Sequence, residues 1–316
     1  MKTYKYIIVT YLFCLLTLPM FGQTLSSLLV GSDSRSYSIG GATVGSGLVE
    51  NGIAGSSGAG AFALENNVAA MSLDGGLIDA AISFGMWQPE YASDKMAGAG
   101  ATWRITRRLA AGILFKYMIQ PEYQASTGNG TDVRDGLFSP KEMNVGMGVS
   151  FAVLKCLSVG ASIRVVNSVL APEASSTVFG ADIGLYFNNK GFSAGLSVNN
   201  LGNKVKYGEK PYSQPMLAKV GAGYSTAFGI SSLSVSAEYD VLFNGAMMAG
   251  AGVEYGIKEI AFMRAGYHYG DSCKAVPSYA SVGLGVKFWG VHIDASYLFA
   301  SKTLNNSFSI SLGYRF

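Results

Sequence analysis

The chain has 316 residues, of which 49% are hydrophobic, only 14% are charged and 41 are glycine, and its mean hydropathy is +0.27. Soluble domains carry about a quarter charged residues and about 7% glycine, so this composition excludes an ordinary soluble protein. The apolar content excludes an intrinsically disordered chain. A formal net charge of +3 gives no electrostatic support for binding nucleic acid.

The first 22 residues have the features of a secretion signal. Lys2 and Lys5 form a basic region, residues 7–18 form an apolar stretch, and we expect cleavage before Gln23. After residue 22, no run of 18 or more residues is both apolar and free of charge, which excludes a helical membrane protein. The sequence therefore predicts an exported protein with a signal peptide at residues 1–22.

Residues 77–316 alternate between apolar and polar side chains. In the last segment, Phe308, Ile310 and Leu312 share one face, while Arg315 lies on the other. Segments of about ten residues with this period are typical of transmembrane β-barrels, in which the apolar face meets lipid. We count fourteen such segments, an even number, at residues 77–87, 95–104, 109–119, 142–152, 157–167, 176–188, 191–199, 216–228, 231–242, 246–256, 260–269, 279–289, 290–300 and 306–316.

The connections between these segments alternate in length. Tight turns such as 106–108 and 289–290 alternate with long connections such as 120–141 and 200–215. Outer-membrane barrels pair short periplasmic turns with longer outer loops. We therefore expect an all-β fold, a 14-stranded antiparallel transmembrane β-barrel in the outer membrane, with its N- and C-termini in the periplasm.

A soluble β-sandwich also alternates, but its polar face is exposed to water and rich in charged residues. Here the polar face is dominated by small residues, for example Gly98, Gly100, Gly250 and Gly252. Small side chains suit the inside of a closed barrel that holds something else. This pattern favours the membrane barrel over the sandwich.

Residues 23–76 precede the barrel and do not alternate; they are rich in glycine, serine and alanine. The segment is long for a simple tail, although a disordered tail is the alternative. The inward glycines of the barrel leave room for it. We expect residues 23–76 to form an N-terminal plug, or hatch, inside a barrel at residues 77–316, rather than to leave an open pore.

Several short motifs carry a resemblance to a known family. They are SRSYSIGGA at residues 34–42, ALENNVAA at 63–70, VNNLG at 198–202, MRAGY at 263–267 and LGYRF at 312–316. With these motifs the chain resembles the PorV/PorQ family, which is itself similar to the FadL long-chain fatty-acid transporters. The resemblance implies a 14-stranded outer-membrane barrel with an N-terminal hatch and no catalytic activity.

The same resemblance implies two possible functions. PorV-like members act in the type IX secretion system, where they accept cargo by its C-terminal domain, and FadL-like members move hydrophobic molecules inward through the hatch. We predict an accessory or cargo-handling component of the type IX system, whose partners are outer-membrane lipid, secretion components and the C-terminal domains of cargo. The alternative is transport of a hydrophobic ligand such as a fatty acid, and a purely structural barrel is a third possibility.

The polar residues that face inward carry nearly balanced charge. For a hydrophobic ligand we would expect an apolar pocket, yet inward aromatic residues are few. We expect these charges to pair with one another and with Asp33, Arg35, Glu50 and Glu65 of the plug, a ligand site being the alternative. The candidate plug and lumen residues are Asp33, Arg35, Asn66, Asn67, Arg164, Asp182, Glu238, Asp240, Glu254, Arg264, His268, His292 and Asp294.

The predicted outer loop at residues 200–215 contains a basic and aromatic cluster. Such a cluster suits contact with an acidic or carbohydrate surface, and a merely solvated loop is the alternative. The candidate partner contacts are Lys204, Lys206, Tyr207, Lys210 and Tyr212.

No pattern predicts an enzyme, a metal site or a cofactor. The chain has two histidines, His268 and His292, and Asp294 shares the face of His292. Such pairs arise by chance wherever polar residues fill alternate positions, so we predict no catalytic triad. The histidines are too scattered for a zinc site. The glycine-rich stretches of residues 45–60 lack the context of a nucleotide-binding loop.

Two cysteines remain after removal of the signal peptide, Cys156 and Cys273. In the predicted topology they lie at opposite ends of a barrel whose apolar band is about 25 Å tall. A disulfide needs α-carbons within about 7 Å. We therefore predict that both cysteines are unpaired.

Overall fold

The computed structural model describes residues 25–46, 60–87, 93–126, 133–171, 174–207, 210–271, 274–300 and 304–316. The predicted signal peptide and Glu50 lie outside these ranges. Within them, no helix has the length and apolar character needed to cross a membrane.

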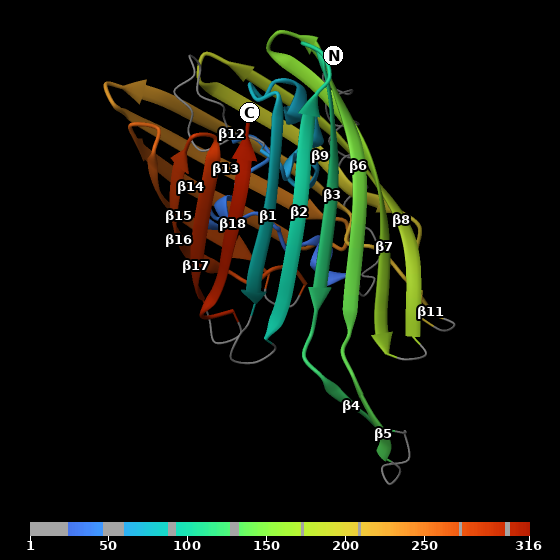
Figure 1. The fold of residues 1–316 in the computed structure, drawn as a ribbon. Helices are drawn as coiled ribbons and strands as arrows, with labels where there is room; N and C mark the ends of the chain where they lie inside the picture. The colour runs from blue at the N-terminus through green and yellow to red at the C-terminus, as the bar shows by residue number, and fades with distance from the viewer. Residues whose placement is uncertain are drawn as a thin grey trace, which may run out of the picture.

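Fourteen antiparallel strands close into one barrel, which confirms the predicted fold class (Figure 1). Each strand pairs with its neighbour along the chain, and β1 closes the barrel by pairing with β18. The barrel strands are β1 (Ile78–Trp87), β2 (Asp94–Arg104), β3 (Leu109–Ile119), β6 (Lys141–Leu154), β7 (Leu157–Ala171), β8 (Ala174–Asn189), β9 (Phe192–Gly202), β12 (Leu217–Phe228), β13 (Ser231–Leu242), β14 (Met247–Ile257), β15 (Ala261–Gly270), β16 (Tyr279–Phe288), β17 (Val291–Ala300) and β18 (Ser307–Arg315).

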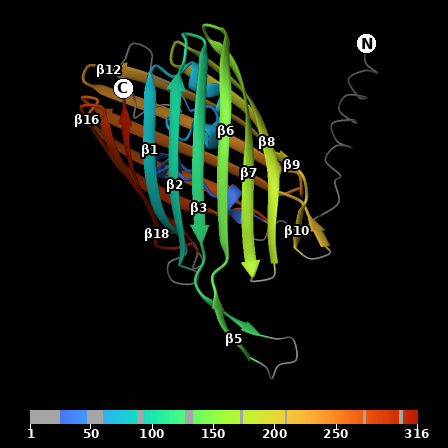
Figure 2. The same ribbon diagram turned by 45° about the vertical axis from the view of Figure 1, so that its right-hand side comes forward.

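Two of the long connections contain hairpins that the sequence pattern left as loops. These are β4 (Tyr123–Ser126) with β5 (Val133–Phe138), and β10 (Val205–Tyr207) with β11 (Lys210–Tyr212). We call this end of the barrel the loop end and the opposite end the turn end. The β4–β5 hairpin reaches well beyond the rim of the barrel in both ribbon views (Figures 1 and 2).

At the turn end, tight turns join neighbouring strands. At Trp289 and Gly290 the φ angles are 51° and 81°, and at Lys190 and Gly191 they are 49° and 82°. Two-residue turns with positive φ at both central positions match the right-handed twist of the strands they join. This backbone geometry explains why the predicted connections at this end are so short.

The outside of the barrel is apolar. Ile82, Ile113 and Leu284, on three different strands, are 59%, 62% and 63% exposed. A continuous exposed apolar belt of this kind is unfavourable in water and matches the lipid-facing band of a membrane barrel. The surface therefore agrees with an outer-membrane location.

The described residues before the barrel lie inside it. We call residues 25–46 and 60–76 the N-terminal segment; it contains four short helices. These are η1 (Ser26–Leu28), α2 (Ser34–Ser38), α3 (Ala63–Asn66) and η2 (Val68–Ser72). Helix α2 contacts β15 to β18, and η2 contacts the inner faces of β6, β7 and β8.

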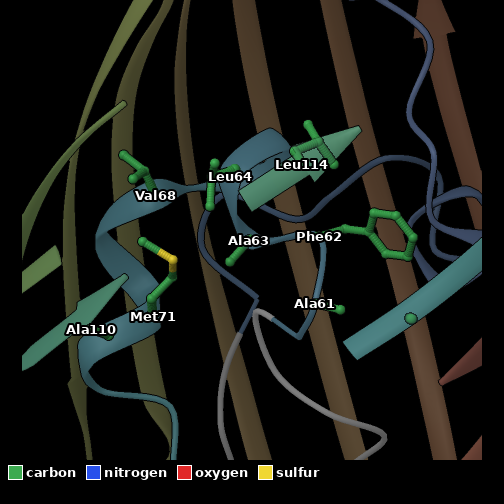
Figure 3. Close-up of a cluster of buried hydrophobic side chains, with 9 residues drawn as sticks. Ala61, Phe62, Ala63, Leu64, Val68, Met71, Ala110 and Leu114 are labelled. Carbon is green, nitrogen blue, oxygen red and sulfur yellow. The ribbon is translucent and has the colours of Figure 1, made fainter. Parts of the chain in front are cut away.

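A hydrophobic core forms where the N-terminal segment meets the wall. Phe62, Leu64 and Met71 of the segment pack with Leu114 of β3 (Figure 3). Ala81 of β1 belongs to the same cluster. Each of these side chains is less than a tenth exposed. Because the outward apolar residues face away from the protein, this interface supplies apolar packing that the barrel wall alone lacks.

Candidate functional site

A cavity of about 80 Å³ lies between the N-terminal segment and the barrel wall. Trp87, Leu217 and Tyr279 border it, and each stands at the loop end of its strand, so the cavity lies toward that end. The acidic residues Glu65, Glu238 and Asp240 and the basic residues Arg164 and Lys219 also line it. We call this space the lumen cavity.

A charged cluster on β12 and β13 forms one wall of the lumen cavity. Glu238 Oε2 accepts hydrogen bonds from the backbone N–H groups of Thr43 and Val44, both at 2.6 Å, and Glu238 Oε1 is 3.3 Å from Lys219 Nζ. Asp240 lies directly across from Lys219 in the strand register. Asp240 Oδ1 is buried and accepts no hydrogen bond within the described part of the chain.

A second charged network joins the N-terminal segment to β14, β15 and β17. Arg35 Nε is 3.2 Å from Glu254 Oε2, and Arg264 Nε is 2.5 Å from the same oxygen. Arg264 Nη1 also lies 2.7 Å from Asp294 Oδ1. Acids and bases thus alternate along the network, so each buried charge faces an opposite one.

Further polar contacts order the N-terminal segment and join it to the barrel wall. Lys116 Nζ is 2.6 Å from Glu65 Oε1, and Asn67 Nδ2 donates to the carbonyls of Val44 at 3.0 Å and Leu185 at 3.2 Å. Asp33 caps α2 by accepting from the Arg35 N–H at 3.1 Å. The contacts with Lys116 and Leu185 tie the segment to the barrel wall near α3 and η2, whereas those with Val44 and Asp33 lie within the segment.

The remaining predicted residues make more local contacts. Asn66 Nδ2 donates to Ser36 Oγ at 3.2 Å, and His268 Nδ1 is 3.3 Å from the Gly40 carbonyl oxygen. His292 is buried beside Gly313. Of the candidate lumen residues, all are buried except Asp33, which is partly buried.

The pairing of β8 with β9 is interrupted midway. Ala181 pairs with Leu201 but Ile183 pairs with Val198, so Asp182 faces two residues of β9 instead of one. Such a bulge leaves backbone groups without ladder partners. Asp182 fills this gap: its Oδ1 accepts from the Asn200 N–H at 2.8 Å, and its Oδ2 pairs with Arg164.

Gln214 closes the same gap from the connection that follows β9. Its Nε2 donates to the carbonyls of Phe179 and Asn203, both at 2.8 Å, and Asn200 Nδ2 donates to the Pro215 carbonyl at 2.9 Å. We call Arg164, Asp182, Asn200 and Gln214 the wall junction. The sequence pattern missed Gln214 because it placed residues 200–215 in an outer loop, where no periodicity marks an inward side chain.

An apolar groove of about 710 Å³ lies on the lipid-facing side of the wall junction. Met147, Ile163, Phe179 and Leu201 line it, and so does Arg164. Arg164 also borders the lumen cavity. The polar space inside the barrel and the apolar space outside it therefore meet at this residue.

The predicted outer-loop cluster lies on the β10–β11 hairpin. Lys204 and Lys206 are exposed, and Tyr212 is partly buried. The Tyr207 hydroxyl donates to Ser168 Oγ at 2.6 Å, and burial raises the pKa of that hydroxyl, which keeps it protonated. The side chain of Lys210 lies outside the described part. The structure thus brings the first two lysines to the surface and uses Tyr207 to pack the hairpin on β7.

The two cysteines are placed as follows. Cys156 is a free, partly buried cysteine in the turn between β6 and β7, at the turn end. Cys273 lies outside the described residues. In the ranges that the structure describes, no three His, Cys, Asp or Glu side chains gather in a way that would hold a metal ion.

No family model matches the chain, and neither does any curated protein. Solved structures do match. The Pseudomonas putida toluene transporter TodX superposes with a TM-score of 0.62 and 12% identity over 91% of this chain and 99% of that one. The Ralstonia pickettii toluene transporter TbuX gives 0.60 and 15% over 91% and 98%. A Pseudomonas aeruginosa FadL homologue gives 0.50 and 14% over 92% and 95%.

These likenesses show that the chain has the fold of FadL-like outer-membrane barrels. At identities this low, a structural likeness shows the fold alone. It does not single out the PorV/PorQ family. The part of the motif-based prediction that is confirmed is the FadL-like barrel fold.

Proposed function

We propose that this protein is an outer-membrane channel for a small hydrophobic molecule, which passes between the lumen and the membrane through the wall junction. The observation that carries the proposal is the position of Arg164, which borders both the lumen cavity and the apolar groove. The toluene transporters with the same fold support this class of cargo. The proposal involves no catalysis and no cofactor.

Because the N-terminal segment fills the lumen, we favour passage through the barrel wall over passage along the barrel axis. The N-terminal segment acts as a plug, because buried ion pairs tie it to the wall at Glu254 and Lys116. The wall junction is held by a buried ion pair, Arg164–Asp182, and by side-chain hydrogen bonds, at a point where β8 and β9 lack regular pairing. An opening that leaves Arg164 paired with Asp182 breaks only the hydrogen bonds of Gln214 and Asn200. Each of these contributes about 1 kcal/mol net, which is less than removing a whole segment from the lumen would cost.

We further propose an orientation for this passage. The loop end faces the exterior and the turn end faces the periplasm, as expected for barrels with long outer loops and short inner turns. The C-terminus, at the turn end of β18, then lies on the periplasmic side, whereas Leu25 packs near Val205 at the loop end, against the expectation that both termini are periplasmic. The lumen cavity, which lies toward the loop end, would receive a molecule from outside.

Filling the groove tests the proposal. We expect Ala181→Trp, which adds a large side chain on the lipid-facing wall of the groove, to slow toluene uptake by cells at least fivefold. Ala295→Trp is the matched control, because Ala295 is a lipid-facing alanine of β17 outside the groove. Equal uptake by the two variants, or uptake that does not depend on this protein at all, would refute the proposal.

A role as a type IX secretion accessory is the second candidate. It rests on the motif resemblance and on the exposed Lys204 and Lys206 of the β10–β11 hairpin, which suit an acidic partner surface. Affinity isolation from outer membranes, with bound proteins and lipids identified together, separates the two candidates. Cargo with a shared C-terminal domain that is lost in a Lys204→Ala/Lys206→Ala variant supports secretion, and retained hydrophobic molecules without such cargo support the channel.

A further inference from the structure

The charges around the lumen cavity do not balance once their partners are assigned. Arg164 is paired with Asp182, and Glu65 is paired with Lys116. Lys219 is then left facing two carboxylates, those of Glu238 and Asp240. The lining of the cavity therefore carries more carboxyl oxygens than the donors around it satisfy.

Asp240 is one of the buried acceptors of this lining that have no hydrogen-bond partner within the described residues. Its residue is 6% exposed, it lines the cavity, and its Oδ1 accepts no hydrogen bond among the described residues. Glu238 Oε2 accepts two backbone N–H groups, whereas Glu238 Oε1 lies 3.3 Å from Lys219 Nζ and, like Asp240 Oδ1, accepts no hydrogen bond in the described part of the chain. A buried carboxylate without a donor is costly, and a positively charged donor is the group that compensates it best.

Aromatic side chains border the same cavity. Tyr37 and Trp87 meet edge to face with ring centroids 4.9 Å apart, and Tyr279 stacks on His268 at 4.8 Å. Met248 and Leu217 add apolar surface. Aromatic faces attract cations and also pack against flat apolar groups.

We propose that the lumen cavity binds a small organic cation, with its ammonium group at Asp240 and its apolar or aromatic part against Tyr37, Trp87 and Tyr279. This inference rests on the proposed channel function and narrows its cargo to amphipathic amines. The cavity of about 80 Å³ has room for about five water-sized positions, which suits a molecule of the size of benzylamine. A larger amine would need the N-terminal segment to shift.

Three aromatic probes of similar size test the charge preference. We would measure binding of benzylamine, benzyl alcohol and benzoate to the purified full chain in detergent at pH 7 by titration calorimetry. We expect benzylamine, a cation at this pH, to bind at least tenfold more tightly than benzyl alcohol, and benzoate to bind most weakly. Asp240→Asn, which keeps the shape of the side chain, should abolish the preference for the amine.

Asp79→Asn is the matched control, because Asp79 is also a buried inward aspartate but lies at the turn end of β1. It should keep the tenfold preference. Equal binding of amine and alcohol by the unaltered protein would overturn the inference, and would mean that a proton held between Glu238 and Asp240 satisfies the cluster. A preference that survives in Asp240→Asn would overturn it as well.

The wild-type probe series decides the question even where a variant fails to fold. Toluene uptake separates this inference from the proposed function. If Ala181→Trp slows toluene uptake but the protein shows no preference for the amine, the proposed channel function is supported and only the amine site is refuted. Uptake that does not depend on the protein removes the channel itself.

Discussion

Arg35 of the N-terminal segment and Glu254 of β14 are 219 positions apart in sequence, yet the Arg35 Nε lies 3.2 Å from Glu254 Oε2 inside the barrel. Arg264 reaches the same carboxylate from β15. Glu254 is therefore the point at which a charge of the segment and a charge of the wall share one acceptor. The contribution of the Arg35–Glu254 ion pair to fixing the N-terminal segment can therefore be tested by replacing Arg35 alone.

We expect Arg35→Met to loosen the N-terminal segment without unfolding the barrel. The substitution keeps much of the apolar stem and removes the guanidinium, while Arg264 still neutralises Glu254. The loss should be about 1.5–3 kcal/mol, the range for a hydrogen bond to a charged group. Hydrogen exchange by mass spectrometry should then show at least tenfold faster exchange in residues 33–46. Exchange in the barrel strands should not change.

Arg107→Met is the control, since Arg107 is exposed in the turn between β2 and β3. It should leave exchange in the segment unaltered. Unchanged exchange in Arg35→Met would show that the hydrogen bonds to Glu238 and the packing of α2 hold the segment on their own.

We expect Gly252→Ala to displace the segment by steric contact. A Cβ added at Gly252 would lie 2.5 Å from the carbonyl oxygen and Cβ of Ile39, too close for the backbones to remain in place. Overpacking of this kind costs about 1–3 kcal/mol. The variant should show larger ionic conductance in planar bilayers than the unaltered protein.

Gly146→Ala provides the comparison for that experiment. A Cβ at Gly146 would meet the Ile163 carbonyl at 3.5 Å, an ordinary contact distance. Its conductance should match that of the unaltered protein. A conductance of porin size in the unaltered protein would contradict the plug itself, whatever the variants do.

The strands could be predicted from the sequence because lipid on one side and the lumen on the other impose a strict period of two. Residues 308–316 show this directly: Arg315 faces inward and Leu312 outward, as the alternation requires. The ends of β7 and β8 were less predictable. These strands run to Ala171 and from Ala174, beyond the range in which membrane contact enforces the pattern.

The inward positions of Glu254, Arg264 and Asp294 could be read from the same alternation, but their partners could not. Pairing depends on the barrel register and on how the segment folds back, and neither leaves a periodic signal in residues 25–46. Gln214 is the clearest example. It lies in the connection that follows β9, yet its side chain donates to the Phe179 carbonyl of β8, near the bulge between β8 and β9. Long-range hydrogen bonds between irregular segments need the folded structure to be found.

We expect Gln214→Met to open the wall junction. Methionine has a similar length but donates no hydrogen bond, so the carbonyls of Phe179 and Asn203 lose the donor that bridges them. Both hydrogen bonds are only partly buried, so the loss of each costs about 1 kcal/mol. Hydrogen exchange should rise at residues 179–180 and 202–203, and toluene uptake by cells should rise at least twofold.

The direction of the change in uptake decides what Gln214 does. Faster uptake means that its two hydrogen bonds oppose passage between β8 and β9, as a closing contact should. Uptake reduced to background would instead mean that the junction must stay intact for the molecule to pass, and the route would lie elsewhere in the lumen. Gln120→Met, at the loop end of β3 and outside the junction, controls for the substitution itself and should leave both exchange and uptake unchanged.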